Sequence, residues 1–295
     1  MHPHPAKLLK HFRIDDADSF DLAKHDTRDT HGITKRGAQD QLGSDAKRLA
    51  DLQERLYAQR EWAVLIILQG MDAAGKDSVI KHVMSGVNPQ GCDVHSFQAP
   101  SHLELAHDFL WRTTVCLPER GRIGIFNRSY YEEVLVVRVH PELLASQKLP
   151  RELVGKAIWK ERFQDIRVFE RHLARNGTLV LKFFLHISRE EQCRRLLDRL
   201  DEPAKRWKFS IDDVTERQRW DAYMEAYADM IRASSRPAAP WYVVPADNKW
   251  FTRLIVAQAV VDALDGLKLD FPKVTGPALE ELHQIRKAFE AEADK

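Results

Sequence analysis

The sequence predicts an α/β fold in which a five-stranded parallel sheet lies between helices. Short, continuously apolar runs recur along the chain, as expected of strands that are buried on both faces. The longer segments between these runs include stretches with apolar residues at steps of three and four, which indicate amphipathic helices. The 295-residue chain is 44% hydrophobic and 30% charged, which is typical of a globular protein with a substantial core.

The first helix and strand lie before residue 71. Apolar residues recur at helical spacing from Arg36 to Leu56, so this segment is predicted to be a helix. Residues 62–70, WAVLIILQG, are apolar without interruption and end in glycine, which favours a buried strand. The segment KDSVIKHVMSG after the next loop is predicted to be a helix that ends near Gly86, because glycine favours the position after a helix.

The same alternation continues along the rest of the chain. Further strands are predicted at residues 92–98, 122–127, 177–188 and 240–246. Further helices are predicted at residues 101–117, 151–175 and 249–267, and a last helix after Pro272. Ser101 and Glu104 have the spacing of a capping box, which marks the start of the helix at 101. Five strands separated by helices predict a parallel α/β sandwich.

Composition excludes several classes of function. The 45 basic and 44 acidic side chains nearly cancel, so an anion site must be a local cluster and nucleic-acid binding is not expected. The three cysteines are far apart, which favours a reducing compartment, and no histidine or cysteine pattern has zinc-site spacing. No apolar run is long enough to span a membrane and the first residues do not resemble a signal peptide, so we expect a cytoplasmic protein without membrane attachment.

A phosphate-binding loop is predicted between the first strand and the helix after it. Gly70, Gly75 and Lys76 match the pattern G-x-x-x-x-G-K in the strand–loop–helix context that the pattern requires. Glycines let backbone N–H groups converge on phosphate oxygens, and Lys76 would neutralise their charge. Ala73 and Ala74 complete the loop and are predicted to bind substrate with it. The alternative is a chance match in an ordinary strand–helix turn.

Two carboxylates accompany this loop. Asp77 stands where a serine or threonine is usual, and Asp72 lies inside the loop. Beside a polyphosphate they would repel the ligand unless a hard cation lay between them. We therefore predict that Asp72 and Asp77 bind Mg²⁺, which Mn²⁺ could replace. The alternatives are a helix-dipole partner for Asp77 and a turn residue for Asp72.

Polar residues also follow the predicted strand at 122–127. Asn127 ends this strand and Arg128 follows it, at the edge of a parallel sheet where ligand sites gather. A guanidinium group suits phosphate binding because of its planar fork, and Glu132 lies a turn or so beyond it. The alternative for both Arg128 and Glu132 is a surface ion pair.

A mobile lid is predicted after the fourth strand, at about residues 190–222. Ser188 and Glu191 have the spacing of a capping box, and Arg195 and Arg199 lie on one face of the helix that follows. Such a lid can bring guanidinium groups onto a transferring phosphoryl group and exclude water. The alternative is a solvated helix with ion pairs, since acidic residues are interleaved. The turn beyond this helix adds three basic residues that could bind the donor: Lys205, Arg206 and Lys208.

Five spaced segments together resemble the polyphosphate kinase 2 family. They span roughly residues 36–269 and are, in chain order, GMDAAGKD, NRSYYEEVLVVRVHPE, RRLLDRLDEPAKRWKFS, DAYMEAY and APWYVVPADNKWFTRL. The resemblance implies a P-loop kinase fold related to thymidylate kinase, with a helical lid. Residues 1–36 are polar and irregular, so we expect an arm that lies on the domain. The predicted division is therefore an N-terminal arm at 1–36, a P-loop kinase domain at 37–272 and a C-terminal helix at 273–295.

The resemblance also implies roles for individual residues. The implied catalytic residues are Asp72, Lys76, Arg128, Arg195 and Arg199. The predicted substrate-binding residues are Gly70, Ala73, Ala74, Gly75, Asp77, Lys81, Asn127, Glu132, Arg138, Lys205, Arg206 and Lys208. Of these, the resemblance places Asn127 and Glu132 near the nucleotide phosphates. Many family members have aspartate where this chain has Asn127, and the asparagine version resembles the branch that accepts both AMP and ADP.

The function implied is Mg²⁺-dependent, reversible transfer of a phosphoryl group from inorganic polyphosphate to AMP or ADP, which gives ADP and ATP. An ATP-dependent nucleoside monophosphate kinase would have the same loop, lid and arginine after the strand, so donor preference separates the two. A non-catalytic regulator that binds polyphosphate or nucleotide is a third reading, and Mg²⁺-dependent turnover would exclude it. The resemblance further implies a homodimer or homotetramer.

Overall fold

The computed structural model describes residues 5–293 and is built around one six-stranded sheet. The strand order is β1-β6-β5-β2-β4-β3, and every neighbouring pair is parallel except β1 with β6. The strands are β1 (Arg13–Ile14), β2 (Ala63–Gln69), β3 (Cys92–Ser96), β4 (Ile123–Asn127), β5 (Thr178–His186) and β6 (Trp241–Pro245). The predicted α/β class and the five predicted strands, β2 to β6, are confirmed.

The strand count was wrong by one, because β1 was not predicted. It has two residues, Arg13 and Ile14, which pair antiparallel with Tyr242 and Trp241 of β6. The sheet is therefore mixed rather than purely parallel. Two residues carry no alternation that could distinguish a strand from a loop, so the sequence holds no signal for this edge.

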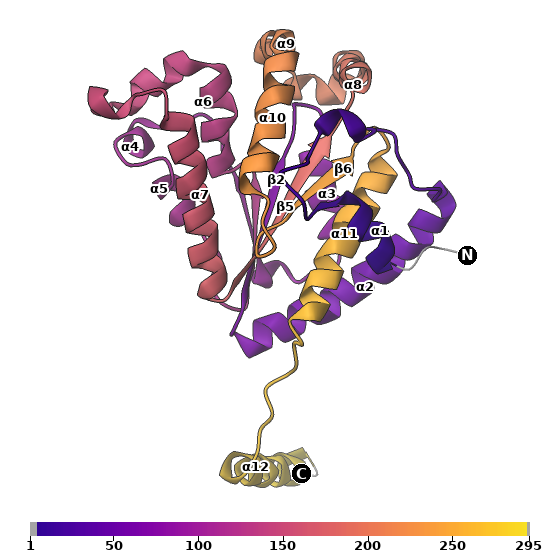
Figure 1. Cartoon of the computed structure of the whole chain (residues 1–295). Coiled ribbons are helices and arrows are strands. Elements are labelled where there is room, and N and C mark those ends of the chain that lie inside the picture. The colour runs from indigo at the N-terminus through magenta and orange to yellow at the C-terminus, as the bar shows by residue number, and fades with distance from the viewer. Residues whose placement is uncertain (1–4, 294–295) are drawn as a thin grey trace.

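Helices cover both faces of the sheet, as Figure 1 shows, with α1, α2, α3 and α11 on one face and α6, α7 and α10 on the other. The α-helices are α1 (Pro5–Phe12), α2 (Lys35–Gln59), α3 (Lys76–Val83), α4 (His102–Leu105), α5 (Trp111–Thr114), α6 (Val136–Val139), α7 (Ile158–Arg175), α8 (Arg189–Asp201), α9 (Ile211–Gln218), α10 (Trp220–Ser234), α11 (Lys249–Gly266) and α12 (Pro277–Ala293). Short 3₁₀ segments join them, including η3 (Tyr130–Val134) and η6 (Pro203–Lys208).

Strand β2 is the centre of the core and places the phosphate-binding loop. All seven of its residues are buried, which explains the uninterrupted apolar run. It lies between β5 and β4, with Leu68 opposite both Phe183 and Asn127. The carboxyl ends of these strands therefore meet at one edge of the sheet, where α/β proteins bind ligands.

The N-terminal segment packs closely on this core. Leu8, Leu9 and Phe12 of α1 are at most 3% exposed, and the ring of Phe12 lies edge-on to that of Phe251 in α11, 5.6 Å between centroids. The segment that was expected to be an irregular arm thus contains a helix and a strand. Its apolar positions were too few to reveal a helical period.

The predicted helix at 101–117 is interrupted. The capping box of Ser101 and Glu104 is present and starts α4, but α4 ends at Leu105 and α5 begins only at Trp111. Between them the side chain of Asp108 accepts a hydrogen bond from the N–H of Leu110, a local turn that competes with the helix.

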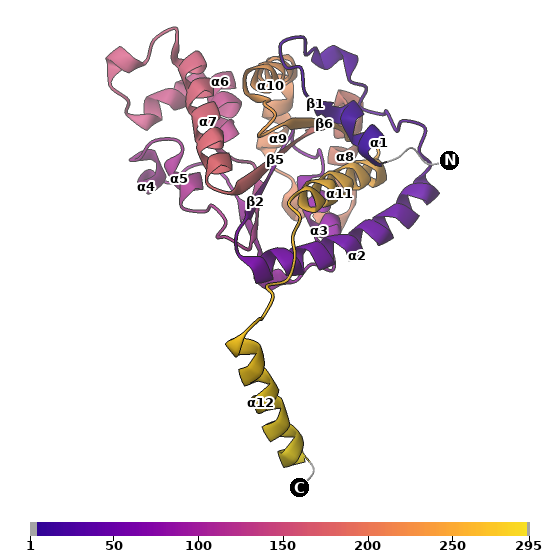
Figure 2. The same ribbon diagram turned by 60° about the horizontal axis from the view of Figure 1, so that its bottom comes forward.

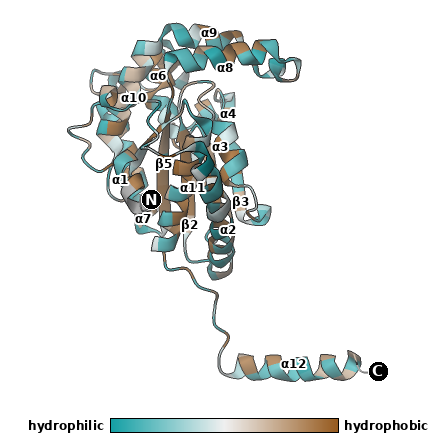
Figure 3. Ribbon diagram, turned by 90° about the vertical axis from the view of Figure 1, so that its right-hand side faces the viewer, coloured by the Kyte–Doolittle hydropathy of each residue, from teal (hydrophilic) through white to brown (hydrophobic). Residues whose placement is uncertain are grey.

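The last helix, α12, lies apart from the rest of the chain in Figures 1 and 2, and no residue of it is buried. Figure 3 shows the contrast between the apolar strands β2 and β5 and the mixed surface of α12. No helix among residues 5–293 combines the length and the apolar character that crossing a membrane requires.

Candidate active site

Glycines shape the loop between β2 and α3. Gly70 has a φ of +155°, and a Cβ there would lie 2.8 Å from the carbonyl oxygen of Leu185. Gly75, which caps α3, has a φ of +109°. Larger residues at these two positions would strain the backbone, so both glycines are required by geometry. The loop leads into the N-terminus of α3, as a phosphate-binding loop must.

Lys76 folds back onto its own loop. Its Nζ donates hydrogen bonds to the carbonyl oxygens of Gly70, at 2.6 Å, and Met71, at 3.2 Å. The residue is 8% exposed. Burial, and then the charge of Arg128, lower the pKa of Lys76, while Asp72 and Glu132 act in the opposite direction. An arriving phosphate would offer this ammonium group a stronger, anionic acceptor than the two carbonyls.

Arg128 and Asp72 form an ion pair at the mouth of the loop, with 2.7 Å between Nη2 and Oδ1. Arg128 has a φ of +64°, and its N–H donates to the carbonyl of Leu68, so the chain turns sharply as it leaves β4. Burial opposes the charge of Arg128, but Glu132 and Asp72 outweigh it and raise the pKa. The guanidinium group is therefore cationic at any physiological pH.

Asp77 has partners from two directions. Its Oδ1 accepts a hydrogen bond from the amide of Asn127 at 2.8 Å, and its Oδ2 lies 3.5 Å from Nζ of Lys208. The first contact connects α3 to the end of β4, and the second connects α3 to the lid segment. Asp77, Asn127 and Lys208 are thus gathered at one point, although they are far apart in sequence.

Arg195 is placed differently from the expectation of a residue that faces the reacting phosphate. It is 4% exposed, and Nη1 donates to the carbonyls of Ala73 and Ala74, both at 3.0 Å. Nη2 donates to the carbonyls of Ala246 and Asp247. The guanidinium group therefore joins α8 to the phosphate-binding loop and to the end of β6. In this arrangement it supports the loop through the backbone carbonyls of Ala73 and Ala74.

Arg199 and the basic turn form the rest of the lid. Arg199 Nη1 lies 3.2 Å from Oδ2 of Asp213, which is itself buried in the capping box of α9. Burial, and then Asp72, raise the pKa of Asp213. Figure 1 shows α8 and α9 together beyond the carboxyl ends of the strands, where a lid over the loop belongs. The capping pattern at α8 is half present, because Ser188 caps the helix while Glu191 pairs with Arg194 and Arg195.

These parts surround one cleft of ≈ 990 Å³, with eight basic and five acidic side chains in its lining. A cleft of this size and charge suits a large anionic ligand. The predicted site residues that line it are Asp72, Ala73, Gly75, Lys76, Asp77, Lys81, Asn127, Arg128, Arg195, Arg199, Lys205 and Lys208.

Five predicted residues are not part of that lining: Gly70, Ala74, Glu132, Arg138 and Arg206. Glu132 accepts a hydrogen bond from the buried Gln69 at 2.8 Å. Arg138 on α6 pairs with Asp229 on α10 at 2.5 Å, and Arg206 donates to the carbonyl of Leu200. In this conformation these charged side chains hold neighbouring elements together.

Among the lining residues that the motifs did not predict are Lys249, Gln98 and Asp213. Lys249 opens α11 directly after β6, and Gln98 follows β3, so the rule that sites gather after parallel strands would have found both. Asp213 was less visible, because an acidic residue near the start of a helix is usually only a cap. Its role depends on the contact with Arg199, which sequence spacing does not reveal.

The carboxylates suit a hard cation. Asp72 lies within the loop and Asp77 just after it, and the charge of each is compensated by one cation, Arg128 for Asp72 and Lys208 for Asp77. Mg²⁺ is often held by one or two carboxylates together with substrate phosphates, so this pair of oxygen donors fits it. Replacement of the protein cations by Mg²⁺ would keep the local charge balanced.

The fold and the cleft define a P-loop phosphotransferase with a basic lid. The family model described as polyphosphate kinase 2 (PPK2) matches residues 32–272, and the chain belongs to that family. The chain is 52% identical to the ADP-polyphosphate phosphotransferase of Rhodopseudomonas palustris over 94% of its own length and 97% of the relative's. It is 45% identical to the AMP/ADP-polyphosphate phosphotransferase of Meiothermus ruber over 90% of this chain and 96% of the relative's.

The solved structure of polyphosphate kinase 2 from Arthrobacter aurescens TC1 is also similar. It superposes with a TM-score of 0.86 at 39% identity and covers 97% of both chains. The likeness therefore includes the N-terminal segment and the lid as well as the sheet.

Proposed function

We propose that this protein transfers the terminal phosphoryl group of inorganic polyphosphate to both ADP and AMP, reversibly and with Mg²⁺. As a member of the polyphosphate kinase 2 family it is a polyphosphate-dependent nucleotide phosphotransferase, and the names of its relatives support the two acceptors. The observation that carries the proposal is that Lys76, Arg128 and basic residues of the lid line one cleft. The family favours this function over the ATP-dependent kinase and the non-catalytic regulator.

Catalysis would consist of alignment and charge neutralisation. The acceptor is a nucleotide phosphate whose second pKa is ~6, so it is already ionised at neutral pH and needs no strong general base. Lys76 and the N–H groups of the loop would bind the donor, and Arg128 would compensate the negative charge that the phosphoryl group carries in transfer. No covalent enzyme intermediate is required.

Asp72 and Asp77 would hold the metal, which when bound supplies charge neutralisation between the phosphates. A donor made only of phosphates offers no base or ribose to grip, so these carboxylates would set its register through the cation. To bind the ion, Asp72 would give up its ion pair with Arg128, and Asp77 would give up its ion pair with Lys208. Both protein cations would then be released toward the phosphates.

The two lid arginines would act in different ways. Arg199 is held by one carboxylate, that of Asp213, and can turn toward the substrate when the lid closes. Arg195 is held by four backbone carbonyls and a carboxylate, so we propose that it positions the loop and the end of β6. This is narrower than the role that the resemblance implied for it.

Acceptance of AMP as well as ADP would depend on Asn127. Its amide donates to Asp77, a contact that a carboxylate at 127 could not make because two carboxylates would repel each other. The amide leaves Asp72 and Asp77 as the charged metal ligands. Glu132 and Arg138, which lie outside the cleft lining, would contribute through the elements that they join.

A donor test separates the proposal from the runner-up. The purified enzyme is given AMP with either polyphosphate or ATP, and the products are separated by anion-exchange chromatography. We expect ADP and then ATP from polyphosphate, with much slower reaction from ATP. Preference for ATP would instead support a nucleoside monophosphate kinase.

We also propose that the protein is a cytoplasmic homodimer or homotetramer. Support comes from α12, where Leu279, Leu282, Ile285 and Phe289 recur at helical spacing and are each at least 41% exposed. Light scattering on the full chain, and on a chain ending at residue 272, tests this contact. A monomeric full chain would contradict the proposal, and an unchanged mass without α12 would move the contact elsewhere.

A further inference from the structure

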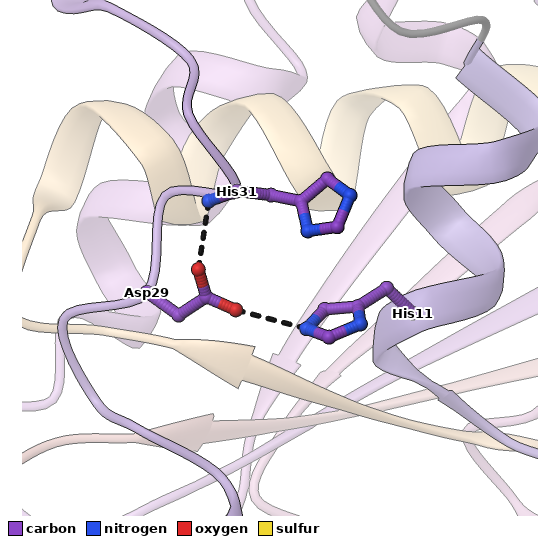
Figure 4. A group of neighbouring side chains, drawn as sticks. All are labelled: His11, Asp29 and His31. Carbon is purple, nitrogen blue, oxygen red and sulfur yellow. Dashed lines mark hydrogen bonds and ion pairs between the residues drawn. The ribbon is translucent and has the colours of Figure 1, made fainter.

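Three metal-ligating side chains meet on the N-terminal segment, away from the cleft. They are His11, Asp29 and His31, and one ligand atom of each lies within 4.8 Å of the others (Figure 4). Within residues 5–293 this is the one group of three or more such side chains that is close enough to share an ion. None of the three lines the P-loop cleft.

We propose that His11, Asp29 and His31 form a binding site for a divalent transition-metal ion of the Zn²⁺ type. Two imidazole nitrogens and one carboxylate oxygen are ligands that Zn²⁺ accepts, and three protein ligands leave a position for water. Mg²⁺ prefers an all-oxygen environment, so the ion that serves the P-loop would not compete well here. The site is therefore chemically distinct from the pair of carboxylates in the cleft.

The ligands are already brought together. Figure 4 shows the rings of His11 and His31 on the same side of the Asp29 carboxylate. The ring centroids are 4.6 Å apart, and Nε2 of His11 lies 2.9 Å from Oδ2 of Asp29. The other carboxylate oxygen accepts the backbone N–H of His31 at 2.7 Å and so orients Asp29. Only small side-chain rotations are needed to point all three toward one ion.

Both segments that supply ligands are held by the core. His11 lies on α1, whose residues Leu8, Leu9 and Phe12 are buried. The loop that carries Asp29 and His31 is anchored at Thr27, whose Oγ1 donates a hydrogen bond to the carboxylate of Asp247 at 2.9 Å. A site on two anchored segments loses little conformational entropy when it binds an ion.

Bound Zn²⁺ would tie α1 to the loop at 27–31. Asp247, which holds this loop, also presents its carbonyl to Arg195 and so connects the N-terminal segment to the support of the phosphate-binding loop. The ion would thus stabilise the folded state by mass action without taking part in the chemistry. Access is open, since the side chains of His11 and Asp29 are 48% and 31% exposed.

The test is a calorimetric titration of the full-length protein with Zn²⁺ in excess Mg²⁺ and without nucleotide. We compare wild type with His11→Gln and with His31→Asn; asparagine tolerates the left-handed backbone at residue 31, where φ is +47°. His283→Gln, on the exposed helix α12, is the matched control. We expect one Zn²⁺ per chain for wild type and the control, and at least about tenfold weaker binding in the two site variants.

Two further readouts separate a metal site from a simple histidine–aspartate contact. Zn²⁺ should raise the thermal midpoint of wild type and of His283→Gln but not of the site variants, and Co²⁺ should give visible absorption that requires both histidines. ATP formation with Mg²⁺ should be unchanged in all variants. Equal Zn²⁺ affinity in wild type and the site variants, or no binding by wild type, would overturn the proposal.

Discussion

The guanidinium group of Arg128 lies 2.7 Å from the carboxylate of Asp72, so the residue that leaves β4 closes the mouth of the phosphate-binding loop. The pair neutralises two groups with different tasks in the proposed reaction, since Asp72 would bind the metal ion and Arg128 would bind phosphate. A donor with its metal ion can replace both halves at once, because the cation takes Asp72 and the phosphate takes Arg128. The ion pair therefore keeps the site in balance before substrate arrives.

Arg128→Ala is expected to lose most of kcat. Removal of a comparable arginine costs up to ~10³–10⁵ in rate in related phosphoryl transfer. Steady-state ATP formation measures the loss, and Arg171→Ala is the control because Arg171 is exposed on α7 and lies outside the cleft lining. A folded Arg128→Ala enzyme with nearly normal turnover would show that the arginine is only part of an ion pair.

Asp72→Asn should weaken the response to Mg²⁺. The amide keeps the size of the side chain but binds a hard cation less well, so more Mg²⁺ is needed for half-maximal rate. Rate is measured against Mg²⁺ concentration at fixed polyphosphate. If the rate of Asp72→Asn depended on Mg²⁺ concentration in the same way as that of wild type, Asp72 would be a turn residue rather than a metal ligand.

The two lid arginines should differ in kind. Arg199→Ala should lower kcat while the free energy of unfolding stays close to that of wild type, because Arg199 contacts one carboxylate at 3.2 Å. Arg195→Ala should also lower the free energy of unfolding by about 1–3 kcal/mol, since buried carbonyls lose their donor. Urea unfolding and kcat are measured for both. Equal stability of the two variants would contradict the supporting role of Arg195.

A buried charged network should dominate local stability. Lys182 in β5 is 0% exposed and donates to Glu170 at 2.6 Å and to Tyr131 at 2.9 Å. Lys182→Met leaves Glu170 buried without its counter-ion and should cost about 3–5 kcal/mol of unfolding free energy. The double variant Lys182→Met, Glu170→Gln should recover part of this, because no unpaired charge remains. A double variant no more stable than the single would contradict this account.

Stability should fall in mild acid because of His186. Burial, and then His25, lower the pKa of His186 from 6.5 to about 4, and its Nδ1 has no partner. His186 binds a proton more tightly in the unfolded chain than in the folded one. The free energy of unfolding is therefore unaffected by His186 above pH 6.5 and decreases as the pH falls toward 4. The difference corresponds to roughly 3 kcal/mol. Between pH 6.5 and 4 the urea midpoint should decrease less in His186→Leu than in wild type. The same dependence of the midpoint on pH in both proteins would refute the assignment.

The fold was predictable because its signals are local. The buried strands β2 and β5 appear as uninterrupted apolar runs, and the loop at Gly70 and Gly75 has fixed spacing. The two-residue strand β1 and the break after Leu105 depend on tertiary pairing and on one side-chain turn, neither of which leaves a period in the sequence.

The cleft was predictable in its composition but not in its contacts. Lys76, Arg128 and Lys208, which the motifs singled out, all line the cleft. The hydrogen bonds from Arg195 to the carbonyls of Ala73 and Ala74 could not be inferred from the sequence. Helical spacing predicts which residues share a face, but it does not predict which other segment packs against that face.

The most direct test of the central claim is ATP formation, followed by luminescence, from ADP with long-chain polyphosphate and Mg²⁺, and then from AMP. Lys76→Ala is the matched inactive control. The account predicts ATP from both acceptors with wild type and almost none with Lys76→Ala. No ATP from either acceptor, together with ADP formed from ATP and AMP, would contradict it by showing that polyphosphate is not the donor.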